Sequence, residues 1–386
     1  MKDEKNTIFT LEKLYIAYRA CLKGKRNTAN ALKFEYNREQ NLYDLLEDLQ
    51  KRTYTISRHI YFIVTNPTPR EIFAADFRDR IVHHLLCTEI QQVFECDFIE
   101  RSYANRIGKG THCAVRQLQQ DLRCVRREYP DGKYYLKLDI ENFFRSIDHT
   151  RLYRLIEYRL RALPEAERGV GSPRWREEVL WLAQLIIFHE PTTNYVYRGD
   201  PDKRQLIPAH KSLFSGQKGA GLPIGNLTSQ FFANVYLHEL DLFITKTLGQ
   251  RSYLRYVDDF VLTDTNRVAL LTLRDPIDVF LKETLGLRLH PKKTVCQAGG
   301  RGVNFLGYIV RANYILVRQS VVKRLRQRLR IYDRQYASCY EPAHPERVLQ
   351  AKNLQATVAS YLGHFSHAQS FRLSQRIRTT YLQDEE

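Results

Sequence analysis

The sequence has few of the features that mark secreted, membrane-spanning or zinc-stabilised proteins. Its seven cysteines form no CxxC pair and are odd in number, which is typical of reduced, buried thiols rather than disulfides or a structural zinc site. The first residues, MKDEKNTIF, contain no apolar signal core, and no run of about 18 apolar residues occurs. We therefore expect a cytoplasmic protein that does not enter a membrane.

A phosphate-binding loop of the Walker A type is also missing. The glycine-punctuated loop SYANRIGKGT at residues 102–111 does not fit that pattern, so it does not indicate a nucleoside triphosphatase. Its backbone amides, with Arg106 or Lys109, could instead hold the phosphate of a template strand or of an incoming nucleotide. We expect a helix to begin near His112.

What the sequence does contain is a large excess of positive charge. Among 386 residues, 60 Lys and Arg stand against 43 Asp and Glu, which gives a net charge of +17. Such an excess favours a polyanionic partner such as nucleic acid, although a merely basic protein would share the composition. Hydrophobic residues make up 43% of the chain, enough for a folded core, and the length suits two or three subdomains.

Two adjacent carboxylates, Asp258 and Asp259, interrupt a run of strand-forming residues in RSYLRYVDDFVLTD. The β-branched and aromatic residues on both sides predict two strands joined at the acids, a hairpin with carboxylates at its tip. Asp139 stands near the end of another apolar strand, in YYLKLDIENFFRSI. An isolated Asp-Asp pair is often only a solvated turn. Together with a strand-end Asp, however, it can hold two divalent cations about 4 Å apart for phosphoryl transfer.

These segments resemble the palm of reverse transcriptases. The resemblance consists of the strand-end Asp139, the Phe143 and Phe144 that follow it, and the later YVDD at residues 256–259. The resemblance covers about residues 60–370. It implies an α+β fold of the right-hand polymerase type, with fingers, an antiparallel palm sheet and a helical thumb. We expect N-terminal helices and fingers in residues 1–130, the palm in 131–310 with an insertion at about 164–218, and the thumb in 311–386.

The same resemblance implies an RNA-directed DNA polymerase whose metal site is built on the three carboxylates. Asp139 and Asp258 would bridge two Mg²⁺ ions, with Mn²⁺ as an alternative. Asp259 would support them, and the carbonyl of Ile140 would complete the ion on the nucleotide side. Template RNA, cDNA and deoxynucleotides would be the partners and substrates.

Three further residues are expected to contact the nucleotide. Arg70, on a hairpin after the turn at residues 66–69, suits fingers that fold over a triphosphate, because Arg presents a fork of donors to phosphate oxygens. A single surface Arg would otherwise only add solubility. Phe144 lies where reverse transcriptases keep a bulky ring against the sugar 2′ position, which predicts exclusion of ribonucleotides. Lys293 would neutralise or protonate the leaving pyrophosphate.

The segment GLPIGNLTSQFFANVYLHEL, residues 221–240, predicts a glycine turn followed by a long helix. In reverse transcriptases this turn and helix lie under the nascent base pair. Most members have Gln-Gly followed by Ser-Pro, whereas this chain has Ile224-Gly225 and Ser229-Gln230, a departure typical of diversity-generating retroelements. Loss of the Gln side chain beside the nucleotide predicts looser base selection, seen most simply opposite template adenine.

Primer and template contacts are expected further along the chain. The segment GVNFLGYI, residues 302–309, resembles a primer-grip hairpin in which Phe305, Leu306 and Gly307 bring backbone against the primer. Arg324 and Arg328 belong to a basic helix that suits phosphate tracking, although a solvated helix face would look the same. SYLGH at residues 360–364 is expected to begin a terminal helical segment, like those of diversity-generating enzymes.

The resemblance to diversity-generating enzymes implies a bacterial or phage-encoded protein. Its expected partners are a small basic accessory protein and a structured template RNA. Too few residues follow the primer grip for an RNase H domain, and no zinc-finger nuclease signature is present. A stand-alone bacterial reverse transcriptase of an antiviral defence system, working with a cognate noncoding RNA, would share every palm motif. A polymerase-derived RNA-binding scaffold and a group II intron maturase remain weaker alternatives.

Overall fold

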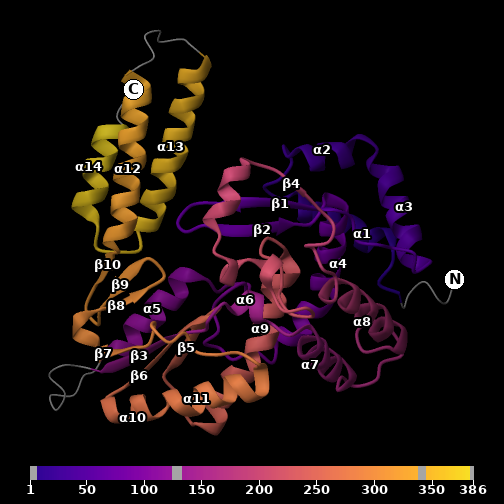
Figure 1. Cartoon of the computed structure of the whole chain (residues 1–386), viewed down its shortest axis with the longest axis horizontal. Coiled ribbons are helices and arrows are strands. Elements are labelled where there is room, and N and C mark those ends of the chain that lie inside the picture. Colours follow the sequence, from indigo (N-terminus) through magenta and orange to yellow (C-terminus); the bar gives the residue numbers. More distant parts are fainter. Residues whose placement is uncertain (1–6, 124–132, 338–344, 383–386) are drawn as a thin grey trace.

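The N-terminal part of the chain packs helices beside a small sheet (Figure 1). A computed structural model describes residues 7–123, 133–337 and 345–382. The first elements are α1 (Leu11–Leu22), α2 (Ala29–Tyr36), α3 (Arg38–Gln50), β1 (His59–Val64), β2 (Arg70–Ala74), α4 (Phe77–Glu95) and α5 (Thr111–Leu122). Asn37, with φ/ψ of −124°/47°, leaves the helical region and separates α2 from α3.

The central part of the chain supplies the main sheet and the helices that cover it. Its elements are β3 (Tyr134–Asp139), α6 (Phe143–Ser146), α7 (His149–Arg161), α8 (Pro173–Ile187), β4 (Tyr195–Tyr197), short 3₁₀ turns at Pro201–Leu206, Ala209–Lys211 and Leu213–Ser215, α9 (Leu227–Leu242), β5 (Tyr253–Tyr256), β6 (Asp259–Asp264), α10 (Arg267–Thr272), α11 (Arg274–Phe280) and β7 (Val295–Ala298). Single π-helical turns at Phe243–Thr247 and Leu281–Leu285 extend α9 and α11.

The main sheet is antiparallel throughout, in the strand order β5-β6-β3-β7. Alternation along β3 sends Leu136 and Leu138 into the large core under α4 and α9, whereas Tyr135 joins a second core with α5. Both faces of the sheet are therefore covered, which explains why its strands are apolar in both registers. Asp139 ends β3 on the same face as Tyr135.

The smaller sheet has the order β2-β1-β4. β1 and β2 form an antiparallel hairpin, with Val64 opposite Arg70 next to its turn. β4 pairs with β1 in parallel, with His59 opposite Tyr195. Part of the segment predicted as an insertion at about 164–218 is thus a strand of this sheet, which connects it to the hairpin that carries Arg70.

The C-terminal part consists of a three-stranded sheet and helices that rise from it (Figure 1). Its elements are β8 (Val303–Phe305), β9 (Tyr308–Val310), β10 (Ile315–Val317), α12 (Gln319–Ala337), α13 (Pro345–Phe365) and α14 (Phe371–Tyr381). Val321, Leu325 and Leu329 of α12 pack with Leu362 and Phe365 of α13.

One prediction about this region is wrong. SYLGH does not begin the terminal helix but lies in the last turns of α13, and the final helix α14 begins only at Phe371. α13 continues past Gly363 because Val358, Leu362 and Phe365 keep a helical spacing that buries them against α12. Among the described residues, no helix is long and apolar enough to cross a membrane.

Candidate active site

A cleft of about 560 Å³ opens between the β1–β2 hairpin and the end of β3. Seven residues that the sequence predicts as part of the site line it together: Arg70, Asp139, Ile140, Phe144, Ile224, Asp258 and Lys293. They come from five separate segments of the chain, so only the tertiary fold brings them together. His210 and Lys211, which the sequence analysis did not single out, also line the cleft.

The backbone brings the three carboxylates to one edge of the main sheet. Asp139 is directly opposite Asp259 in the β3–β6 register, and the N–H of Ile140 donates to the carbonyl of Asp258 at 3.3 Å. The predicted hairpin is confirmed, with Val257 and Asp258 between β5 and β6. Val257 has a φ of +56°, a left-handed conformation that a β-branched residue adopts only under strain.

A buried ion pair behind the hairpin holds this strained turn. The guanidinium of Arg255 lies 2.6 Å from Asp241, and neither side chain is exposed. Arg255 also donates to the carbonyl of Val257 at 3.2 Å and to Ser102 Oγ at 3.2 Å. Because one side chain bonds both the turn and the neighbouring segments, it fixes the position of the carboxylates that follow.

The electrostatic environment favours a cation beside Asp258 and Asp259. Burial, reinforced by the neighbouring charge of Asp139, raises the pKa of Asp258. Burial also raises the pKa of Asp259 to about 6, against the opposing effect of Lys137. Both shifts mean that negative charge is poorly solvated here, so a further positive charge would stabilise the ionised forms.

Two lysines already pair with the carboxylates. Lys293 Nζ lies 2.7 Å from Asp139 Oδ1, and Lys137 Nζ lies 2.8 Å from Asp259 Oδ2. Lys137 also donates to the carbonyl of Asn304 at 2.9 Å. The sequence analysis missed Lys137, although its place two residues before Asp139 on one strand already puts both side chains on the same face.

The donor set fits divalent cations only in part. Oδ1 of Asp259 is buried without a hydrogen-bond partner, and Asp139 and Asp258 both face the cleft, so hard oxygen ligands are available. Within residues 7–123, 133–337 and 345–382, however, no group of three or more His, Cys, Asp or Glu is arranged to hold a metal ion. Lys293 bonds Oδ1 of Asp139, so ligation through that oxygen would require Lys293 to move away.

A comparison with known protein families shows which family this chain belongs to. Residues 66–310, more than half of the chain, match the family described as reverse transcriptase (RNA-dependent DNA polymerase). The chain belongs to this family. The predicted α+β right-hand polymerase fold is thereby confirmed.

Individual relatives of this reverse transcriptase are distant. It is 20% identical over 351 residues to the group II intron-encoded protein LtrA of Lactococcus lactis subsp. cremoris, covering 74% of this chain and 51% of LtrA. It is 26% identical over 185 residues to the retron Ec73 reverse transcriptase of Escherichia coli, covering 46% of this chain and 47% of that protein. The chain thus spans about half the length of these curated relatives. Among solved structures, a Candida albicans telomerase matches with a TM-score of 0.48 and 11% identity, over 86% of this chain and 57% of that one.

On one side of the cleft, the hairpin of β1 and β2 lies against the glycine turn. The carbonyl of Ile224 accepts a hydrogen bond from the N–H of Phe73 at 3.0 Å. Gly225 has a φ of +123°, and a Cβ there would come within 2.8 Å of Ile72. Only glycine therefore allows the turn to lie against β2, with the Ile224 side chain at the cleft.

Two residues predicted to bind phosphate, Arg106 and Lys109, make ion pairs with nearby acids in the structure. Arg106 is almost buried, pairs with Glu95 at 2.7 Å and donates to the carbonyl of Ser102. Lys109 pairs with Glu100 and lies over the ring of Tyr103. These contacts brace the loop before α5 and leave neither cation facing the cleft. The helix near His112 is confirmed as α5.

The two side chains predicted to lie under the nascent base pair, Ser229 and Gln230, differ in exposure. Ser229 is buried and lines a small internal cavity beside His59 and His83 rather than the cleft. Gln230, the next residue of α9, is exposed. Of the two predicted contact residues, only Gln230 is exposed, whereas Ser229 is buried.

The predicted primer-grip hairpin has a tight turn. Leu306 and Gly307, between β8 and β9, both have positive φ, +48° and +90°, as in the two-residue turns that match strand twist. Phe305 is buried in the second core, so only its backbone is available to a primer. A Cβ at Gly307 would lie 3.2 Å from the ring of His364, which places α13 directly against this turn.

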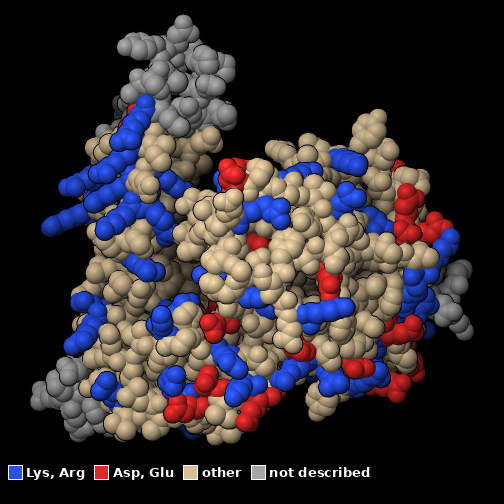
Figure 2. All heavy atoms as spheres, viewed as in Figure 1, with Lys and Arg blue, Asp and Glu red and all other residues tan. Residues whose placement is uncertain are grey.

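The basic residues of α12 gather with others over the C-terminal helices, in the upper left of Figure 2. Arg328 is exposed, and its guanidinium lies over the ring of Tyr361 at 5.8 Å. Arg324 is half-buried, with Nε lacking a hydrogen-bond partner. Neither residue lines the cleft, so their predicted role with nucleic acid lies outside the reacting centre.

Proposed function

We propose that this reverse transcriptase is an RNA-directed DNA polymerase that copies a structured template RNA into cDNA from deoxynucleotides. The observation that supports it most strongly is the convergence of Asp139 and Asp258 with Arg70 and Lys293 in one cleft. Carboxylates and cations that line one cleft match the needs of a primer end and a triphosphate.

The proposed reaction assigns each cleft residue a task. Asp139 and Asp258 hold two divalent cations, Mg²⁺ or Mn²⁺, with Asp259 and the Ile140 carbonyl in support. When bound, the ions activate the attacking oxygen and stabilise the leaving oxygen. Arg70 binds phosphate oxygens through its fork of donors.

Lys293 is placed for two roles. It lies 2.7 Å from Asp139 in the structure, and its half-exposed ammonium can turn to the triphosphate once Asp139 gains another cation. There it neutralises or protonates the departing pyrophosphate. Phe144 lies against the sugar and leaves no space for a 2′ hydroxyl, and the hairpin of Leu306 and Gly307 supports the primer.

The test is primer extension on an RNA template by the wild type and by Asp258→Asn. The variant should lose at least about three orders of magnitude in rate, because groups that act as one unit fail together. Asp275→Asn, at an exposed acid on α11, is the matched control and should keep wild-type activity. Equal extension by Asp258→Asn and the wild type would refute the assignment.

We further propose that the enzyme serves a diversity-generating retroelement, with a small basic accessory protein, in the cytoplasm of a bacterial host. Support comes from Ile224, an apolar side chain at the cleft where most reverse transcriptases place Gln. The substitution Ile224→Gln should lower misincorporation opposite template adenine, measured by sequencing cDNA copied from one defined RNA. An unchanged error spectrum would count against this subtype.

The similarity to a retron reverse transcriptase favours a second candidate, a stand-alone enzyme of antiviral defence that copies a noncoding RNA. Sequencing the nucleic acid that copurifies with the protein separates the two. Copies of a variable repeat with substitutions at adenines support the retroelement. Faithful copies of one noncoding RNA support the defence enzyme.

A further inference from the structure

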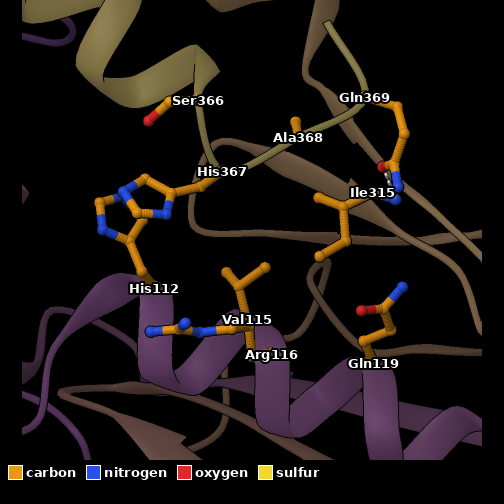
Figure 3. Close-up of a pocket in the computed structure, with 9 residues that line it drawn as sticks. All are labelled: His112, Val115, Arg116, Gln119, Ile315, Ser366, His367, Ala368 and Gln369. Carbon is orange, nitrogen blue, oxygen red and sulfur yellow. Dashed lines mark hydrogen bonds between the residues drawn. The ribbon is translucent and has the colours of Figure 1, made fainter.

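A second cavity, of about 370 Å³, lies between α5, β10 and the connection from α13 to α14 (Figure 3). It shares no lining residue with the catalytic cleft. Its wall on α5 consists of residues spaced three or four apart, so one helix face is turned toward it. The lining residues are His112, Val115, Arg116, Gln119, Ile315, Ser366, His367, Ala368 and Gln369.

One wall of the cavity is a flat aromatic stack. The rings of His112 and His367 lie 3.5 Å apart at an interplanar angle of 20°, and His367 is exposed. Figure 3 shows this stack on one side of the cavity, with the apolar side chains of Val115 and Ile315 beside it. A third planar ring could extend the stack while its edge rests on the apolar floor.

Hydrogen-bonding groups stand across from the stack. The side-chain amide of Gln119 makes no hydrogen bond to another described residue, so it can both donate and accept. Gln369 accepts from the N–H of Ile315 at 2.7 Å through Oε1, which leaves its NH₂ group to donate. A planar ligand with donors and acceptors along its edge, such as a nucleobase, fits this arrangement.

The charge around the cavity suits a phosphate. Arg116 is exposed, and its nearest polar partner is Cys113 Sγ at 4.0 Å. At the other end of α5, Arg123 donates to the carbonyl of Ala312, which brings a second guanidinium to the β9–β10 turn. None of the described residues that line the cavity is acidic. The volume lies within the range of nucleotide-sized sites, about 300–1,000 Å³.

We propose that this cavity binds one unpaired nucleotide of an RNA strand, with the base stacked on His367, its edge on Gln119 and Gln369, and its phosphate on Arg116. The inference rests on the proposed function, because it needs RNA at this enzyme. Recognition of unpaired RNA bases by aromatic and Arg side chains is common. Nascent cDNA is paired with its template, so RNA outside the copied region is the source of a free base.

The cavity is also connected to the catalytic hairpin. Thr111 Oγ1, next to His112 at the start of α5, donates to the hydroxyl of Tyr256 at 3.1 Å. Tyr256 ends β5 directly before the turn that carries Asp258. An RNA nucleotide stacked on His367, whose ring lies on that of His112, would therefore lie near the start of α5, which contacts the strand before the carboxylates.

The test uses the full-length protein and a single-stranded RNA 20-mer of mixed sequence that carries 4-thiouridine. Ultraviolet cross-linking followed by peptide mapping should mark residues 112–119 or 366–369. By fluorescence anisotropy, His367→Ala and Arg116→Ala should each weaken binding at least about fivefold. The charge-matched control is Arg372→Ala, which removes an exposed Arg on α14 that does not line the cavity. It should weaken binding less than about twofold, because it removes at most one phosphate contact.

Several results would overturn the inference. These are cross-links confined to other segments, unchanged affinity in both cavity variants, or an equal loss in Arg372→Ala, which would indicate diffuse charge only. Equal binding of a DNA 20-mer with the same cross-links would overturn the assignment to RNA. Primer extension by the wild type, measured in parallel, separates these failures from a failure of the polymerase proposal itself.

Discussion

At the scale of single residues, the site depends on which positive side chain neutralises each carboxylate. Asp139 and Asp259 are paired with different lysines, whereas Asp258, whose pKa is raised by burial and by the charge of Asp139, makes no ion pair with a described residue. Lys137 differs from Lys293 because it also bonds the backbone of β8 through Asn304. It therefore links the catalytic edge of the main sheet to the hairpin that is expected to hold the primer.

Replacing Lys137 by Met should uncouple these two elements. Both oxygens of Asp259 would then lack partners, and the Asn304 carbonyl would lose its donor, so we expect kcat to fall about tenfold to a hundredfold. KM for the nucleotide should change much less, because Lys137 does not line the cleft. Steady-state kinetics of single-nucleotide addition measures both quantities.

Two controls accompany this measurement. Lys137→Arg keeps the charge and the donors and should recover part of the loss, whereas Lys282→Met, at an exposed position, should have no effect. A fall in KM alone, or no recovery with Arg, would contradict the positioning role.

Phe144 tests the sugar side of the cleft. It belongs to the single turn α6, and its carbonyl accepts from the N–H of Leu222 at 2.7 Å, so its backbone is fixed beside the glycine turn. Phe144→Ala should raise the use of ribonucleotides relative to deoxynucleotides at least about tenfold in kcat/KM. Phe144→Tyr keeps the ring and should keep the discrimination. Continued exclusion of ribonucleotides by the Ala variant would discard the gate.

At the scale of elements, the carboxylate hairpin is held from behind rather than by its own turn. Its positive-φ Val257 is unfavourable alone, and Arg255 compensates through a bond to the Val257 carbonyl and the buried pair with Asp241. The predicted strands could be read from their apolar residues. This pair could not, because nothing local connects an Arg in a strand to an Asp on a preceding helix.

Breaking that pair should destabilise the whole protein. Arg255→Met leaves Asp241 as an unpaired buried charge, and we expect the free energy of unfolding to fall by about 3–5 kcal/mol. Urea denaturation measures it. The double variant Arg255→Met with Asp241→Leu should recover a large part, since it removes both charges. A single variant within about 1 kcal/mol of the wild type would show that the pair contributes little.

At the scale of the whole molecule, the fold class was accessible to sequence reasoning but several contacts were not. The apolar residues before Asp139 located β3, and the glycine turn at residues 221–225 located the start of α9. The ion pairs of Arg106 and Lys109 were not accessible in this way, since the pairing of a cation depends on acids outside its own loop, here Glu95 and Glu100. The stack of His112 on His367 was equally invisible, because it joins residues from opposite parts of the chain.

A buried histidine cluster gives the molecule a predictable response to acid. His59 and His189 stack at 5.0 Å between β1 and the end of α8, and burial lowers the pKa of His59 to about 4 and that of His83 to about 3. In the unfolded chain these imidazoles take up protons near pH 6.5. Between pH 6.5 and 4 the unfolded state therefore binds more protons, and stability falls as the pH falls.

Comparison with a variant isolates this contribution, because buried acids such as Asp79, with a pKa of about 6, act in the opposite direction. We expect the loss of unfolding free energy from pH 7 to pH 4.5 to be smaller in His59→Phe than in the wild type, by up to about 3 kcal/mol. Urea denaturation at both pH values measures the difference. Identical pH dependence in the two proteins would contradict the assignment.

The pairing of β4 with β1 also bears on how the hairpin of β1 and β2 can move. Glu71 of β2 accepts hydrogen bonds from Ser212 Oγ and the N–H of Leu213, so the segment that contributes His210 and Lys211 is tied to the strand that begins with Arg70. Closure of the hairpin over a substrate would carry His210 and Lys211 along with Arg70. Deleting the segment that contains β4 would leave β1 as an unpaired edge strand. Exposed edge strands pair with other chains and promote aggregation.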